Sequence, residues 1–309
     1  MKKREKMSDS IVDVVIIGAG PAGIQAAIHA ARKKTSVLVL GRIENSALYG
    51  AHIENYACIK GVTEGRVLLE AGISQILNFG AKVIPEDVLS IAQPNKFFEL
   101  ELESSKTIHC RTIIFTMGVS KKKLSVPGER EFIGQGVSYC VDCDANFYRG
   151  ARVMVAGNRS AAVDGALTLT DYAQKVYLVA KELTVSPELM DRLQKSTVEV
   201  LTPNWVKEIH GENAVSSVTL EDDSTVNLDG IFIELGSKGA LELATQIGVA
   251  LDSERFKYIE TNRRQETNIA GIYAAGDIVG PPYQMAKAVG EGCIAGMEAA
   301  TFARKQKRA

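Results

Sequence analysis

The sequence is poor in the residues that mark several common classes of protein. In 309 residues it has five cysteines and four histidines, which are too few and too scattered for a disulfide framework or a zinc cluster. Basic and acidic residues nearly balance, at 36 and 37, so no nucleic-acid or anionic-membrane partner is indicated. No apolar run is long enough to span a bilayer, and no apolar signal-peptide core follows the basic start. We therefore expect a cytoplasmic protein without a metal site, and the length predicts two domains.

The cysteines divide into one close pair and three isolated residues. Cys140 and Cys143 form a Cys-x-x-Cys sequence. A lone pair at this spacing in a cysteine-poor protein indicates redox or catalytic chemistry rather than a structural crosslink. Cys58, Cys110 and Cys293 lie in or beside apolar runs, where a buried and inert thiol is expected.

The start of the chain carries a dinucleotide-binding pattern. Strands are predicted over 12–17 and 37–40, with a helix over 24–32 between them. The first strand is followed by three glycines at the spacing Gly-x-Gly-x-x-Gly: Gly18, Gly20 and Gly23. In this setting the first glycine permits a tight turn, the second lets the backbone approach a pyrophosphate, and the third allows close helix–strand packing. The N–H groups at the helix N-terminus would then face the phosphates.

A second unit of this kind follows further along the chain. Strands are predicted over 152–156 and 176–179, a helix over 160–173, and more strands over 196–235. Between the two units, residues 81–111 alternate in places and predict an antiparallel insertion, from which residues 112–118 return as a buried strand. The chain closes with a glycine-containing segment over 271–277 and a helix predicted over 284–304.

Three motifs together resemble the low-molecular-weight thioredoxin reductase family over essentially the whole chain. They are Gly18-Ala-Gly-Pro-Ala-Gly23, Tyr139-Cys-Val-Asp-Cys-Asp144 with Phe147-Tyr-Arg-Gly150, and Tyr273-Ala-Ala-Gly-Asp277. The resemblance implies a homodimeric FAD enzyme that reduces the disulfide of a thioredoxin-like protein. It implies Cys143 as the thiol against the flavin, Cys140 as the thiol that attacks the partner disulfide, and Asp144 as proton donor and acceptor. This division suits the chemistry, because the thiolate is the nucleophile and a nearby carboxylate can carry the proton.

The resemblance also implies the FAD site and the domain organisation. The expected cofactor-binding residues are Gly18, Gly20, Pro21, Ala22, Gly23, Asn55, Gly118, Gly276, Asp277, Gln284, Met285 and Ala286. The predicted fold class is α/β, with two Rossmann-like, three-layer ββα nucleotide-binding domains, the second inserted into the first. Residues 1–121 and 239–309 form the predicted FAD domain, and residues 122–238 form a degenerate NADPH-like domain with the cysteine pair. The lysine run 121–123 is expected to be an exposed interdomain crossing.

The second dinucleotide turn departs from the pattern of an NADPH enzyme. Aligned as Ala156-Gly-Asn-Arg-Ser-Ala161, it lacks glycine at Ala156 and Asn158, the position where the backbone would approach a pyrophosphate. The next strand ends in Ala180-Lys-Glu182 instead of a basic cluster, and the Glu182 carboxylate would repel a 2′-phosphate. Both changes predict that nicotinamide nucleotides are poor donors.

A narrower resemblance fits these departures. The segments 46–56, 234–239 and 288–292 resemble the pyridine-nucleotide-independent branch, which includes ferredoxin-dependent flavin thioredoxin reductases and their deeply rooted or diflavin-linked relatives. The leading hypothesis is therefore an FAD disulfide reductase that takes electrons from ferredoxin. Three alternatives stay open: an NAD(P)H-dependent thioredoxin reductase with a divergent nucleotide site, a flavin dithiol oxidase that uses oxygen, and a non-catalytic flavoprotein.

Overall fold

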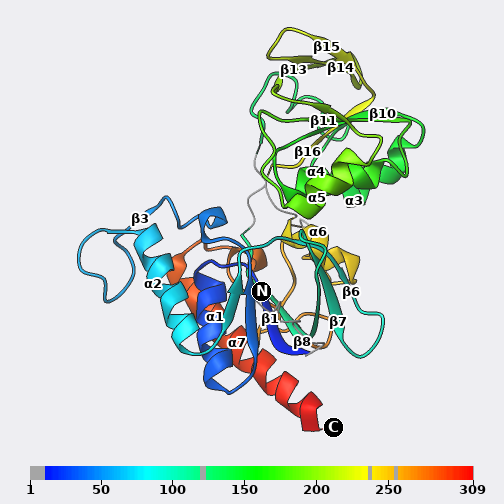
Figure 1. Cartoon of the computed structure of the whole chain (residues 1–309). Coiled ribbons are helices and arrows are strands. Elements are labelled where there is room, and N and C mark those ends of the chain that lie inside the picture. The colour runs from blue at the N-terminus through cyan, green and yellow to red at the C-terminus, as the bar shows by residue number, and fades with distance from the viewer. Residues whose placement is uncertain (1–10, 119–122, 236–238, 254–256, 309) are drawn as a thin grey trace, which may run out of the picture. The chain divides into compact units, whose positions relative to one another are not determined.

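The computed structural model describes residues 11–118, 123–235, 239–253 and 257–308, and the chain divides into two compact units (Figure 1). Unit 1 comprises Met1–Leu102, Lys106–Val119 and Leu243–Ala309, and unit 2 comprises Glu103–Ser105 and Ser120–Glu242. The predicted domain boundaries, at 121/122 and 238/239, lie in or at the edge of stretches outside the described residues, as does most of the lysine run 121–123. Those boundaries stay predictions.

Unit 1 is built on a sheet in which β1 and β8 are central. The strand order is β5-β2-β1-β8-β7-β6, and β17 pairs with the C-terminal half of β8. Strands β1, β2, β5, β8 and β17 run parallel to one another, whereas β7 is antiparallel to both of its neighbours, β6 and β8. Their bounds are β1 Val12–Ile17, β2 Val37–Leu40, β5 Lys82–Ile84, β6 Val88–Ala92, β7 Phe98–Leu102, β8 Thr107–Phe115 and β17 Ile272–Ala274. A short hairpin pairs β3 (His52–Ile53) with β4 (Thr63–Glu64).

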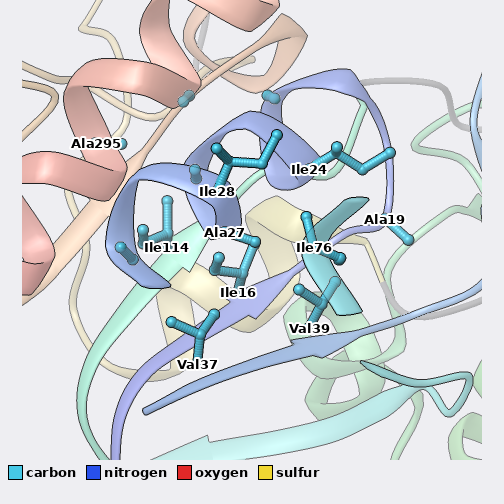
Figure 2. Close-up of a cluster of buried hydrophobic side chains, with 14 of the residues drawn as sticks. Ile16, Ala19, Ile24, Ala27, Ile28, Val37, Val39, Ile76, Ile114 and Ala295 are labelled. Carbon is cyan, nitrogen blue, oxygen red and sulfur yellow. The ribbon is translucent and has the colours of Figure 1, made fainter. Parts of the chain in front are cut away.

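Three helices belong to unit 1: α1 (Pro21–Arg32), α2 (Gly65–Asn78) and α7 (Met285–Arg308). In Figure 2, side chains of α1 lie over those of β1 and β2, with Ala295 of α7 beside them. Two glycines on one face of α7 explain how closely α7 approaches α1. A β-carbon at Gly292 would come within 2.2 Å of the Ala22 carbonyl oxygen, and one at Gly296 within 2.3 Å of the Ala26 carbonyl oxygen. Glycine at these positions therefore allows the two helices to pack backbone against backbone.

Unit 2 repeats the strand–helix–strand arrangement. Its parallel sheet has the order β12-β11-β10-β16-β9, and a separate antiparallel sheet has the order β13-β14-β15. The strand bounds are β9 Val137–Ser138, β10 Arg152–Ala156, β11 Lys175–Val179, β12 Glu199–Leu201, β13 Val206–Gly211, β14 Val215–Leu220, β15 Thr225–Asn227 and β16 Gly230–Ile233. The helices are α3 (Val141–Asp144), α4 (Ser160–Leu169) and α5 (Pro187–Gln194), and α6 (Ala240–Gln246) follows β16.

The structure confirms the α/β class and corrects several element bounds. Helix α1 begins at Pro21 rather than at residue 24, because proline needs no N–H partner in a first turn. Within the expected antiparallel insertion, β5 instead pairs parallel with β2. Strand β8 begins at Thr107 and runs without a break into the segment expected to start at 112. Helix α4 ends at Leu169, before residue 173, and α7 continues past 304 to Arg308.

The isolated cysteines do not share one environment. Cys110 is buried in β8, and burial raises the pKa of its thiol far above the ordinary value, as expected for an inert side chain. Cys293 is partly exposed on α7. Cys58 is exposed, so the expectation that it is buried was wrong: it lies outside any strand or helix, with a φ of 71°.

Candidate redox and cofactor sites

The cysteine pair lies at the start of a short helix in unit 2. Cys140 and Cys143 form a disulfide with an S–S distance of 2.09 Å and a Cα–Cα distance of 5.3 Å. Cys140 is the N-cap of α3, and its Sγ accepts a hydrogen bond from the Cys143 N–H at 3.2 Å. Cys140 is 8% exposed, whereas Cys143 is exposed. The thiol expected to attack the partner disulfide is therefore the less accessible of the two in this conformation.

Asp144 is linked to the pair through a serine. The Ser138 hydroxyl donates to Asp144 Oδ2 at 2.6 Å and accepts from the Cys140 N–H at 3.1 Å. The Asp144 N–H in turn donates to the Cys140 carbonyl oxygen at 3.2 Å. The structure thus brings together all three predicted catalytic residues, and the Asp144 carboxylate lies one hydroxyl group away from the backbone of Cys140.

A buried carboxylate holds the segment that leads into the pair. Glu129 is 3% exposed and accepts from the N–H groups of Leu124 and Ser125 and from the Tyr139 hydroxyl, the last at 2.7 Å. Burial, together with the hydrogen bond and the negative charge of Glu129, raises the pKa of Tyr139 well above its ordinary value. Tyr139 is therefore a fixed hydrogen-bond donor directly before Cys140.

The three glycines of the first turn are required for different reasons. Gly18 has a φ of +120°, and a β-carbon there would meet Thr116 at 2.8 Å. A β-carbon at Gly23 would lie 2.0 Å from the Gly18 carbonyl oxygen. Gly20 differs, because its φ is −84° and among the described residues only the Ser46 side chain, at 3.3 Å, would meet a β-carbon. Packing therefore explains glycine at 18 and 23 but not at 20, where a ligand that approaches the backbone would explain it.

The N-terminus of α1 offers donors for such a ligand. Gly20 is the N-cap with no side-chain hydrogen bond, and Pro21 occupies the first helical position. The N–H groups of Ala22 and Gly23 donate to no described residue. Free N–H groups and the positive end of the helix dipole attract phosphate. These residues fit the pyrophosphate of a dinucleotide such as FAD.

A second part of the predicted cofactor site is held by an ion pair of α7. Gly276, with a φ of 87°, donates its N–H to Glu291 Oε2 at 2.9 Å. Lys287 Nζ donates to the carbonyl oxygens of Gly276 and Gly280 and lies 3.1 Å from Glu291. Burial raises the pKa of Asp277, and the charge of Lys287 opposes this rise. These hydrogen bonds from Lys287 and to Glu291 hold the backbone on both sides of Asp277, the residue expected at the FAD ribityl chain.

The structure brings some of the remaining predicted cofactor residues into contact. The Asn55 side-chain amide donates to Gln284 Oε1 at 3.0 Å, and a β-carbon at Gly276 would lie 3.1 Å from that of Ala22. Met285 and Ala286 begin α7, whereas Gly118 is exposed beyond the end of β8. The predicted cofactor residues all belong to unit 1 and the predicted catalytic residues all belong to unit 2.

The second turn is shifted by one residue from its predicted alignment. The Gly18 N–H donates to the carbonyl oxygen of Leu40, the last residue of β2, and the Gly157 N–H donates to that of Val179, the last residue of β11. Gly157 is therefore the equivalent of Gly18, and Ala156 is the end of β10. The predicted loss of glycine at Ala156 and Asn158 was wrong.

The corrected alignment moves the departure to the helix N-cap. Arg159 is the N-cap of α4 and stands where Gly20 stands in unit 1, and Ala162 corresponds to Gly23. Arg159 has an extended φ of −125°, which any residue adopts. A long side chain therefore replaces the one glycine that packing does not require.

The residues after β11 have also lost the charge that would select a 2′-phosphate. Lys181 Nζ pairs with Glu221 at 2.9 Å, and Glu182 is exposed beside it. A nucleotide phosphate would have to compete with Glu221 for the one lysine in this segment and would lie near the Glu182 carboxylate.

Several residues that shape these sites were not predicted from the sequence: Thr116, Glu129, Ser138, Lys287 and Glu291. One signal was present. Lys287 and Glu291 are four residues apart on a predicted helix, which is the spacing of an ion pair. Glu129 sits in a polar stretch with no pattern that marks it as buried, so only the fold shows its role.

Within residues 11–118, 123–235, 239–253 and 257–308, no helix is both long and apolar enough to cross a membrane. No group of three or more His, Cys, Asp or Glu side chains within those ranges is arranged to hold a metal ion.

Comparisons with known proteins agree with this geometry. Residues 12–292 match the family described as pyridine nucleotide-disulphide oxidoreductase. The chain is 35% identical to the thioredoxin reductase of Bacillus subtilis over 299 residues, which cover 93% of each protein. The structure resembles that of the atypical thioredoxin reductase TRi from Desulfovibrio vulgaris Hildenborough, with a TM-score of 0.81, 33% identity, and coverage of 95% of this chain and 98% of the other. It also resembles a ferredoxin-flavin thioredoxin reductase from Clostridium acetobutylicum, with a TM-score of 0.67, 33% identity, and coverage of 96% and 99%. The chain therefore belongs to the pyridine nucleotide-disulphide oxidoreductase family, as an FAD-dependent disulfide oxidoreductase of the thioredoxin reductase type.

Proposed function

We propose that this protein reduces the disulfide of a thioredoxin-like protein with electrons that come from reduced ferredoxin rather than from NADPH or NADH. The observation that carries the choice of donor is the second turn. Arg159 stands at the position where a nucleotide pyrophosphate would approach the backbone, and Lys181 is paired with Glu221. Each lost charge-assisted contact weakens binding by about 1.5–3 kcal/mol.

The energetics permit a ferredoxin donor. Two electrons passing from a plant-type ferredoxin near −400 mV to a thioredoxin near −270 mV release about 6 kcal/mol. FAD, when bound, supplies chemistry that accepts electrons singly or in pairs, which a one-electron donor and a two-electron disulfide both require. The similarity to the C. acetobutylicum protein, which is a ferredoxin-flavin thioredoxin reductase, supports the same donor.

The proposed residue roles follow the family resemblance. Cys140 attacks the partner disulfide, Cys143 is the thiol beside the flavin, and Asp144 holds or releases the thiol proton. The Ser138 bridge between Asp144 and the Cys140 backbone supports the last role. Because Cys140 is 8% exposed, its attack on a large partner requires the segment around α3 to move.

The second candidate is an NAD(P)H-dependent thioredoxin reductase, and one observation favours it. The first and third positions of the second turn keep small residues, Gly157 and Ala162, so only the middle position is altered. The B. subtilis relative is also named simply as a thioredoxin reductase.

One experiment separates the candidates. The holoenzyme is mixed under argon with NADPH, NADH or reduced ferredoxin in separate stopped-flow runs, and flavin absorbance is followed. We expect ferredoxin alone to bleach the flavin within seconds, and a final addition of dithionite shows that all the flavin is reducible. Bleaching within seconds by millimolar or lower nucleotide would overturn the choice of donor. Rapid reoxidation in air with a dithiol as the only donor would instead favour a dithiol oxidase.

We also propose a homodimer in the cytoplasm. Helix α7 exposes Ile294 and Met297, which are 38% and 40% exposed and lie three residues apart on one helix face. Sedimentation equilibrium of the wild type and of an Ile294→Glu/Met297→Glu variant tests the assembly. A monomeric wild type would contradict it.

A further inference from the structure

A buried carboxylate contacts the start of the redox helix α3 in unit 2. Glu234 follows the apolar strand β16 and is 7% exposed. Charged side chains are almost never this buried unless protein groups engage them. Groups of the protein must therefore offset the cost of burying the Glu234 carboxylate.

The backbone of Glu234 closes the second turn. Its N–H donates to the Ala156 carbonyl oxygen at 2.9 Å, just as the Thr116 N–H donates to that of Ile17 at 2.9 Å in unit 1. The Glu234 carbonyl oxygen lies 2.0 Å from where a β-carbon would stand on Gly157. This contact explains why Gly157 is glycine, and it places Glu234 at the position that Thr116 occupies in unit 1.

The side chain of Glu234 extends toward the redox helix. Its Oε1 accepts a hydrogen bond at 3.3 Å from the N–H of Val141, the residue bonded to Cys140. A β-carbon on Gly165 of α4 would lie 2.9 Å from Val141 Cγ2 and 3.9 Å from Glu234 Cγ. Glycine in a helix interior is unfavourable by about 1 kcal/mol relative to alanine. Gly165 therefore leaves room for Val141, with the Glu234 side chain beside it.

We infer that Glu234 is a positioning residue for the Cys140–Cys143 pair, and that its negative charge makes the reduced pair a stronger reductant. The carboxylate anchors the start of α3 through the Val141 N–H. Its charge opposes the additional negative charge that forms at the pair when a thiol ionises to the attacking thiolate. To the extent that one thiol of the reduced pair is ionised, the reduced form is thereby disfavoured relative to the disulfide.

The reaction that Glu234 biases is thiol–disulfide exchange. The reduced pair carries two electrons and two protons more than the disulfide. A thiolate of the pair attacks one sulfur of the partner disulfide, forms a mixed disulfide and releases the other partner sulfur as a thiolate. The second thiol of the pair then resolves the mixed disulfide, so that Cys140–Cys143 is oxidised and the partner becomes a dithiol. A charge that disfavours the reduced pair moves this exchange toward the reduced partner.

The test measures the redox equilibrium of the pair directly. The holoenzyme is equilibrated under argon at pH 7.0 with mixtures of reduced and oxidised dithiothreitol, quenched by alkylation and digested with trypsin. The peptide 131–149, which ends at Arg149, contains Cys140 and Cys143 and no other cysteine, so its mass reports the pair alone. We expect Glu234→Gln to shift the equilibrium constant toward the dithiol by about tenfold, which corresponds to about 30 mV.

Three control variants make the result specific. Glu234→Gln retains an acceptor for the Val141 N–H and removes the negative charge. Glu234→Asp retains the charge and is expected to stay within about twofold of the wild type. Asp229→Asn removes a carboxylate from the opposite end of β16, where it pairs with Arg152, and is expected to leave the equilibrium unchanged.

An unchanged equilibrium in Glu234→Gln would overturn the inference. If the glutamine variant does not fold, Glu234→Ala and Glu234→Asp replace it as the decisive pair, and equal shifts in these two would overturn the inference as well. The inference rests on the proposed exchange role of the pair but not on the electron donor, because dithiothreitol replaces the donor. A nicotinamide-dependent enzyme would therefore leave this result unaffected.

Discussion

The two dinucleotide turns of this chain share a backbone arrangement, and the side chains that differ between them include those at the helix N-cap and behind the turn. In both, the glycine after the first strand donates to the end of a neighbouring strand, and the residue after a third strand closes the turn. Unit 1 has Gly20 at the helix N-cap and Thr116 after β8, whereas unit 2 has Arg159 and Glu234 at the equivalent positions. Under the proposed function, the side chains at the N-cap and behind the turn, rather than its backbone fold, decide what such a turn binds.

The largest expected effect comes from filling the open position of the first turn. Gly20→Val should yield protein without FAD, because the added carbons would occupy the space where the pyrophosphate meets the backbone. Of the residues that the structure describes, only Ser46 lies near a β-carbon at this position, so the apoprotein should still fold. Flavin absorbance per polypeptide and circular dichroism measure the two effects. The matched variant Arg159→Val should keep its FAD, and a full FAD content in Gly20→Val would disprove the placement.

Changes at the cysteine pair should leave the FAD content of unit 1 intact while abolishing disulfide reduction. In Cys140→Ser the remaining Cys143 thiolate should produce a long-wavelength charge-transfer band with the flavin. Cys143→Ser should lack this band and should still form a mixed disulfide with the partner through Cys140. Absorbance spectra and non-reducing gels report these outcomes, and a band confined to Cys143→Ser would reverse the proposed roles.

Restoring the second turn should raise nucleotide affinity. The double variant Arg159→Gly/Glu182→Arg reopens the approach to the backbone and adds one phosphate partner. Since each charge-assisted contact contributes about 1.5–3 kcal/mol, NADPH should bind at least about tenfold more tightly than to the wild type. Anaerobic titration with NADPH measures this, with Glu182→Gln as the control for charge removal alone. No gain in affinity would show that another feature of unit 2 excludes the nucleotide.

The smallest effect concerns ion pairs at equivalent positions of the first strands. Asp13 of β1 is buried with Lys307 at 2.7 Å and Arg111 at 3.3 Å, whereas Arg152 of β10 pairs with Asp229 at an exposed site. Asp13→Asn should reduce the free energy of unfolding by about 1–3 kcal/mol, because it leaves cations without their partner. Asp229→Asn should cost less than about 1 kcal/mol. Equal losses in urea denaturation would contradict this contrast.

The pKa of Asp13 predicts how the stability difference between the wild type and Asp13→Asn depends on pH. Burial acts to raise the pKa of Asp13. The hydrogen bonds from Lys307 and Ser36 and the positive charge of Lys307 outweigh this effect, so the pKa is lowered from 3.8. A lowered folded-state pKa means that the stabilisation is present above about pH 4 and is lost as the pH falls through the folded-state value. The stability difference between wild type and Asp13→Asn should therefore shrink below that pH, and a constant difference down to pH 2 would argue against the assignment.

Sequence patterns predicted strands β1, β2, β10 and β11, the first turn and the cysteine pair because each rests on local rules. Glycine spacing and apolar periodicity are read within a few residues, and they located Gly18, Gly20 and Gly23 correctly on a turn. The second turn was misaligned because Ala156 is small enough to end a strand or to enter a turn, and only the hydrogen bond from Gly157 to Val179 distinguishes these. Glu234 lies after an apolar run that gives no hint of its partner, since Val141 is distant in sequence.

In both turns the closing contact with the first glycine includes a backbone carbonyl group, that of Thr116 in unit 1 and that of Glu234 in unit 2. Any amino acid supplies this carbonyl, so the backbone contact alone does not require a particular side chain, although in unit 1 the Thr116 hydroxyl also donates to the carbonyl oxygens of Ile17 and Gly18. If Glu234 acts as inferred, a duplicated dinucleotide unit contains a position where substitution leaves the backbone of the turn intact and alters the chemistry behind it. In evolutionary terms, such a position would let a nucleotide-binding copy acquire a different role without first losing its fold.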